Sequence, residues 1–135
     1  EWDPKLIDAR NNEGLTPFIT AAIKGHVDVL EALYAERKDL LTQKAINGDT
    51  PFMLAAYNGH VDVMKFLYAE GGEKLLTQTN KYGHTALHLA AAGGHSAAVS
   101  LLLEWGGAFL LYIKNNDGCT PWDLAEKKPE IREIM

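Results

Sequence analysis

A short motif recurs four times along this chain at nearly constant spacing, and this recurrence limits the fold more than any other feature. Each copy has a threonine two positions after a glycine, and successive threonines are 34, 35 and 35 residues apart. A unit of this length cannot bury its own apolar side chains, so neighbouring units have to stack. The glycine–threonine pairs are Gly14 and Thr16, Gly48 and Thr50, Gly83 and Thr85, and Gly118 and Thr120.

Each unit reads as a turn followed by two helices. The glycine supplies the backbone freedom of a tight turn, threonine is a favourable N-cap, and a following proline suits the first helical position. A short alanine-rich helix then ends at a glycine, and a second helix carries one buried apolar stripe. The glycines expected to end the first helices are Gly25, Gly59 and Gly94. The residues expected to be buried on the second helices are Val29, Leu30 and Leu33; Val63, Met64 and Leu67; and Val99, Ser100 and Leu103.

These register marks resemble those of the ankyrin-repeat family. The family's T-P-L-H-x-A signature is matched by Thr85-Ala86-Leu87-His88-Leu89-Ala90 and, in altered form, by Thr16-Pro17-Phe18-Ile19 and Thr50-Pro51-Phe52-Met53. The resemblance implies an all-α solenoid of helix-turn-helix units joined by β-turn or hairpin loops. The period exceeds the family's usual ~33 residues by one or two. We expect the additional residues, near 36–39, 71–74 and 106–109, to form extended loops or an extra helical turn on one edge, a secondary candidate surface.

The repeat divides residues 1–135, read as one ankyrin-repeat domain, into successive units. We expect repeats at 11–44, 45–79 and 80–114, and a C-terminal capping repeat at 115–135, where Lys127-Lys128-Pro129-Glu130 replaces the Gly-His of earlier units. Residues 1–10 match the tail of a truncated upstream repeat, which predicts an excised piece or a cleavage product. Trp2 is expected to cover part of that open end.

Composition narrows the class of protein. The net charge of −5 argues against a surface built as a whole to bind phosphates, and a single cysteine excludes an internal disulfide. No apolar run approaches the ~18 residues that a membrane span requires. The first residues are too polar for a secretory signal. We therefore expect an intracellular, cytoplasmic chain.

The histidines and the cysteine do not converge on a catalytic or metal site. Equivalent residues of stacked units lie roughly 8–10 Å apart, whereas zinc ligands converge within about 2 Å of the ion. We expect His26, His60 and His95 to bond backbone groups in the turns. The same spacing separates Cys119 from His84, too far for a nucleophile and its base. We predict no catalysis, no cofactor and no metal.

The other two histidines, His84 and His88, lie in or next to a turn. The resemblance implies a structural hydrogen bond from His88 to the neighbouring turn. His84 lies at a turn tip, where a contact role and plain solvation both stay open.

The resemblance also implies a partner surface, the concave surface, lined by the turn tips and the exposed faces of the first helices. Its matching positions carry seven basic and three acidic residues, a charge of +4, which leaves −9 on the rest of the chain. This predicts an acidic partner and salt-sensitive association, although chance can also produce such a distribution. The candidate partner-binding residues are Leu15, Ile23, Lys24, Lys44, Ile46, Asp49, Tyr57, Asn58, Lys81, Tyr82 and His84.

Aromatic residues near the middle of this surface suggest where binding would concentrate. Interface hot spots favour aromatic side chains in desolvated pockets. We expect Tyr57, Tyr82, Ile46 and His84 to form an apolar centre, rimmed by three lysines. The alternative is that Tyr57 only covers its alanine-rich helix. The lysines of the rim are Lys24, Lys44 and Lys81.

The sequence thus favours a non-catalytic protein–protein interaction module, monomeric or part of a longer chain. One alternative is the substrate-targeting domain of a larger enzyme or effector. Another is nucleic-acid or anionic-lipid binding, with Tyr57 or Tyr82 stacking on a base, which the net charge disfavours.

Overall fold

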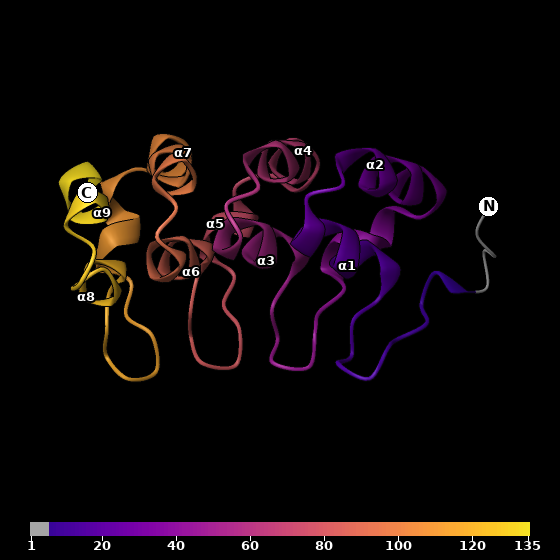
Figure 1. Cartoon of the computed structure of the whole chain (residues 1–135), viewed down its shortest axis with the longest axis horizontal. Coiled ribbons are helices and arrows are strands. Elements are labelled where there is room, and N and C mark those ends of the chain that lie inside the picture. The colour runs from indigo at the N-terminus through magenta and orange to yellow at the C-terminus, as the bar shows by residue number, and fades with distance from the viewer. Residues whose placement is uncertain (1–5) are drawn as a thin grey trace.

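The computed structural model describes residues 6–135, and its helices follow one another in pairs separated by loops (Figure 1). The described part contains no strand. The elements are α1 (Pro17–Lys24), α2 (Val27–Glu36), η2 (Lys38–Thr42), α3 (Pro51–Tyr57), α4 (Val61–Gly71), α5 (Lys74–Thr77), α6 (Ala86–Gly93), α7 (Ser96–Gly106), η3 (Ala108–Tyr112), α8 (Pro121–Leu124) and α9 (Pro129–Ile134).

The pairs form a linear stack. Figure 1 shows α1, α3, α6 and α8 in one row, with α2, α4 and α7 in a second row and the hairpin-shaped loops projecting from the opposite side. Along the first row, α1 packs on α3, α3 on α6, and α6 on α8. Along the second, α2 packs on α4 and α4 on α7. The expected all-α solenoid is confirmed.

The four repeated threonines begin the first helices, as predicted. The side chains of Thr16, Thr50, Thr85 and Thr120 each accept a hydrogen bond from the backbone N–H three residues later. This bond satisfies one of the N–H groups that a helix leaves unpaired at its start. The same local chemistry therefore sets the start of every unit.

The second helices bury one stripe each, but the predicted stripe of the third repeat is wrong. Ala98, Val99 and Leu102 are the buried residues of α7, whereas Ser100 is exposed and Leu103 is only partly buried. The buried residues of α7 lie 35 positions after those of α4. The predicted stripe is therefore displaced by one residue, because the small Ala98, and not Ser100, is the buried neighbour of Val99. The prediction for Val29 is also wrong, because its side chain is 42% exposed and the buried residues of α2 are Leu30 and Leu33.

The additional residues of each period form short helices. Of the two forms left open, the extra helical turn is the one observed, as η2, α5 and η3. Each of these elements buries a leucine in the common core, namely Leu40, Leu75 and Leu110. The extra residues are thus part of the packed stack.

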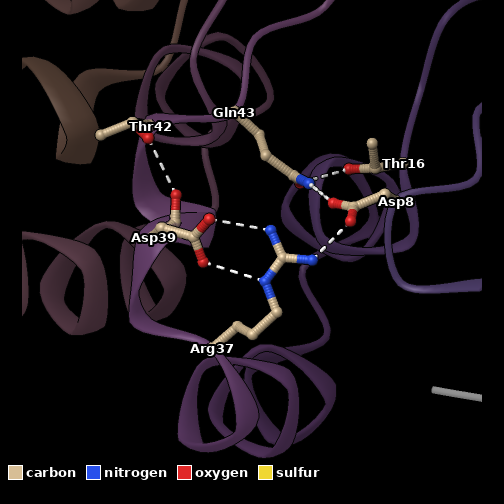
Figure 2. A network of polar contacts seen from close by, with 6 residues as sticks. All are labelled: Asp8, Thr16, Arg37, Asp39, Thr42 and Gln43. Carbon is tan, nitrogen blue, oxygen red and sulfur yellow. Dashed lines mark hydrogen bonds and ion pairs between the residues drawn. The ribbon is translucent and has the colours of Figure 1, made fainter. Parts of the chain in front are cut away.

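A polar network holds residues 6–10 against the first repeat (Figure 2). Arg37 pairs with Asp8 and, at 2.8 Å, with Asp39. The side chain of Gln43 donates to Asp8 and accepts from Thr16. The guanidinium of Arg37 lowers the pKa of the Asp39 carboxyl. The expected role of Trp2 lies outside the described residues.

Candidate binding surface

In three of the four turn tips, one asparagine side chain accepts two backbone hydrogen bonds. The Asn80 side-chain oxygen accepts hydrogen bonds from the backbone N–H groups of Tyr82 and His84, at 2.9 and 3.0 Å. Asn11 and Asn115 make the equivalent pairs of bonds in the first and last tips. Short polar side chains favour turns because they can bond nearby backbone groups in this way. The tip side chains are therefore carried on preformed loops.

Neighbouring tips are also bonded to one another. The backbone N–H of Lys81 donates to the carbonyl of Asn47 at 2.9 Å, and that of Asn116 donates to the carbonyl of Tyr82 at 2.9 Å. The side chain of Asn116 adds a bond to the carbonyl of Lys81. These bonds fix the spacing of successive tips.

Four of the candidate residues, Asp49, Tyr57, Tyr82 and His84, come together in one pocket. Tyr57 at the end of α3 and Tyr82 and His84 on the third tip line a pocket of about 260 Å³, together with Leu54 and Leu89. Tyr57 is 46% exposed and Tyr82 is 56% exposed. The tyrosine rings thus form accessible walls of a pocket that is also lined by the polar residues Asn47, Asp49 and Asn80.

Ile46 lies in the adjoining pocket, between the first and second tips. This pocket, of about 310 Å³, is lined by Leu15, Ile46 and Leu54 among others. Leu54 also lines the pocket of Tyr57, so the two hollows share this residue. The apolar centre expected from the sequence is therefore divided over two hollows.

Two candidates are engaged within the protein rather than free on its surface. Asp49 is 7% exposed, and its carboxylate accepts a 2.8 Å hydrogen bond from the Asn80 side chain. Asn58 ends α3, and its side-chain amide donates to the carbonyl of Leu54. The tip and the helix end thus use the polar groups of Asp49 and Asn58.

The three rim lysines, Lys24, Lys44 and Lys81, are exposed. None of them forms an ion pair with a residue in the range 6–135. Ile23 is half-buried, and its carbonyl lies 2.8 Å from the ring nitrogen Nε2 of His60. The charges of the three rim lysines are therefore available to a partner.

His88 and His84 lie side by side but in different environments. His88 is fully buried, its Nε2 donates to the carbonyl of Cys119 at 3.0 Å, and its Nδ1 accepts from the backbone N–H of Thr85. The implied structural bond to the neighbouring turn is thus present, and burial lowers the pKa of His88. His84 is half-buried, with its Nδ1 3.3 Å from the side-chain amide of Asn115.

His60 and His95 occupy equivalent positions in successive repeats. The ring of His60 packs against Gly25 and that of His95 against Gly59, each glycine belonging to the preceding repeat. His60 bonds to the end of the preceding first helix rather than within its own turn. Among the described residues, no three histidine, cysteine or carboxylate side chains gather closely enough to hold a metal ion.

Comparison with known families agrees with this architecture. A family model described as ankyrin repeats (3 copies) matches residues 3–78, and a second, described as ankyrin repeat, matches residues 82–116. The chain belongs to the ankyrin-repeat family. Ankyrin repeats are generally protein–protein interaction modules, typically without catalysis of their own. A search of curated proteins found no match.

Membrane-spanning character is not seen in the part of the chain that the structure describes. No helix there combines the length and the apolar composition needed to cross a bilayer.

Sequence reasoning missed the asparagines. Asn80 and Asn115 hold the tips and reach neighbouring side chains, yet they were not among the candidates. Their recurrence 35 residues apart, five positions before each threonine, was the available signal. Leu54 and Leu89 were missed because a half-buried leucine on a first helix reads as core.

Proposed function

We propose that this chain is a non-catalytic protein–protein interaction module that binds an acidic partner surface on its turn tips and first helices. The observation that carries the proposal is the meeting of Tyr57, Tyr82 and His84 around one pocket. Exposed aromatic rings beside a pocket are typical of interface hot spots.

Charge supports the same surface. Lys24, Lys44 and Lys81 are exposed and belong to the repeats whose residues line the two pockets. They have no ion-pair partner among residues 6–135. The tip-to-tip hydrogen bonds hold the surface in shape before binding, which reduces the entropy that association loses. An acidic partner would therefore meet a preformed basic and aromatic surface.

The test compares single variants in binding to a partner identified by affinity purification. Tyr57→Ala and Tyr82→Ala are each expected to weaken binding by more than ~1 kcal/mol. Lys65→Ala is the control, because Lys65 is exposed on α4 and lines neither pocket. Unchanged affinity in both tip variants contradicts the proposal.

The same variants address the alternative functions. A salt-sensitive shift with single-stranded RNA or anionic vesicles, lost in Tyr82→Ala, would favour nucleic-acid or lipid binding. A role as the targeting domain of a larger enzyme would use the same surface, and the parent sequence would reveal it.

We also propose the division into repeats at 11–44, 45–79 and 80–114 with a C-terminal cap at 115–135. Leu6 and Ile7 stand ten positions before Thr16, as the leucine pairs of η2 and α5 stand before the next threonines. Ile7 is 5% exposed, which supports assigning residues 6–10 the place of the last turn of a repeat unit.

A further inference from the structure

We propose a second binding surface on the edge of the stack, formed by α5, η3 and the end of α7, for a basic partner segment that carries an apolar anchor. We call it the aromatic edge and define it by Trp105, Phe109 and Tyr112. This proposal stands on residues outside the two tip pockets, so it does not depend on the function proposed above.

Aromatic residues occupy this edge only in the third repeat. The residues 35 positions earlier, at the same places in the second repeat, are Glu70, Lys74 and Thr77. Polar residues also stand at these places in the first repeat, where they are Glu36, Asp39 and Thr42. Three positions that are polar in both other repeats are thus aromatic together in one.

Trp105 packs against the core, but the fold does not require the aromatic side chains of Phe109 and Tyr112. Lys74–Thr77 and Lys38–Thr42 form the equivalent short helices without them. In η3 the buried residue is Leu110, while Phe109 is 57% exposed and Tyr112 is 76% exposed. Neighbouring exposed aromatic rings of this kind mark interaction sites.

A pocket lies beside the rings. It has a volume of about 330 Å³ and is lined by Trp105, Phe109, Glu73 and Lys74 among others. Trp105 stacks on Tyr68 with ring centroids 4.0 Å apart and planes 9° apart. This stacking fixes the indole as a preformed wall, against which an apolar side chain of a partner can pack.

The charge of the edge selects a basic partner. Elements α7 and η3 carry one charged residue, Glu104, and no basic one, while α5 and its N-cap contribute Glu73 and Lys74 to the pocket. The elements that form the edge thus carry two carboxylates and one amine, of which Glu73 and Lys74 line the pocket. An aromatic ring beside carboxylates favours a lysine or arginine side chain.

Other aromatic rings in the same molecule show how such a cation is held. The Nζ of Lys38 lies 4.4 Å from the ring centre of Tyr34, and the guanidinium carbon of Arg132 lies 4.4 Å from that of Trp122. Within residues 6–135, no cation covers Phe109 or Tyr112 in this way. We infer that a lysine or arginine of the partner takes that place.

The test uses a short labelled peptide of leucine and arginine residues, and a matched peptide in which each arginine is glutamate. Fluorescence anisotropy is measured with the whole chain and with Phe109→Ala/Tyr112→Thr, where the threonine is the residue of the second repeat. We expect the arginine peptide to bind and the double variant to lose about tenfold in affinity. Far-ultraviolet circular dichroism of the variant checks that the helices remain.

The control variant is Asn12→Ala, at an exposed residue of the first tip that lies outside the aromatic edge and its pocket, and it is expected to leave the peptide affinity unchanged. The proposal is overturned if the arginine peptide does not bind, if the glutamate peptide binds equally well, or if only the control variant loses affinity. It is also overturned if the edge variant abolishes self-association in sedimentation or binding to anionic vesicles, since the occupant is then a second copy or a membrane.

Discussion

The carboxylate of Asp49 accepts a hydrogen bond from the side-chain amide of Asn80, across the boundary between the second and third repeats, at 2.8 Å. Asp49 is 7% exposed and Asn80 is 8% exposed. The same asparagine holds its own tip through two backbone N–H groups. One side chain therefore shapes a loop and joins it to the preceding unit.

Removing this amide should destabilise the stack. Asn80→Ala leaves a buried carboxylate and two backbone N–H groups without partners, and we expect a loss of about 1–3 kcal/mol in the free energy of unfolding. Urea unfolding measures the change. Asn12→Ala is the matched control, because Asn12 is exposed on the first tip, and it should change stability by less than about 0.5 kcal/mol. Equal effects of the two variants would contradict the role given to Asn80.

The close approach of the tips can be tested at two equivalent glycines. Gly83 and Gly118 have φ of 79° and 80°, so alanine is strained at both. A Cβ at Gly83 would also lie 2.8 Å from the backbone nitrogen of Asn116, whereas a Cβ at Gly118 meets nothing within 4 Å. We expect Gly83→Ala to cost about 1–3 kcal/mol more than Gly118→Ala in thermal or urea unfolding. A smaller or reversed difference would show that the tips move apart freely.

Stability should fall in mildly acidic solution because of His88. Burial lowers the pKa of this imidazole, and its Nδ1 accepts a hydrogen bond that protonation would remove. Below about pH 6.5 the unfolded chain takes up a proton there that the folded chain does not, so stability is lost as the pH falls. The contribution is at most about 1.4 kcal/mol per pH unit.

Urea unfolding between pH 7.5 and pH 5 measures this dependence of stability on pH. The carboxyls of Asp39 and Asp123, whose pKa values are lowered, release their stabilisation at lower pH than this window. His88→Gln should reduce the slope. A slope that the substitution leaves untouched would place the titration elsewhere.

Partner association should depend on the rim lysines. Lys81→Glu reverses a charge beside the pocket of Tyr82, and we expect the association rate to fall by roughly threefold or more at low salt. Stopped-flow kinetics at two salt concentrations measures it. Lys65→Glu, on the exposed side of α4, makes the same change in net charge and should have a smaller effect. Equal slowing by both would mean that only net charge matters.

Local chemistry made the repeat architecture readable from the sequence. Thr50 caps its helix through its own side chain and a backbone N–H three residues away, so the start of α3 depends on a few neighbouring residues. Gly25 and Gly94 end their helices in the left-handed conformation for the same local reason. Apolar periodicity then predicted the second helices, apart from the exposed Val29 in α2 and the one-residue displacement in α7.

Contacts between repeats were decided by the tertiary structure alone. The sequence placed Tyr57, Tyr82 and His84 on one surface, but their meeting in a single pocket depends on how α3 and the third tip are stacked. The carboxylate of Asp49 is hydrogen-bonded to Asn80 because these two residues, 31 positions apart, face each other across a repeat boundary. Burial and pairing of this kind arise from the packing of units, which local propensity does not encode.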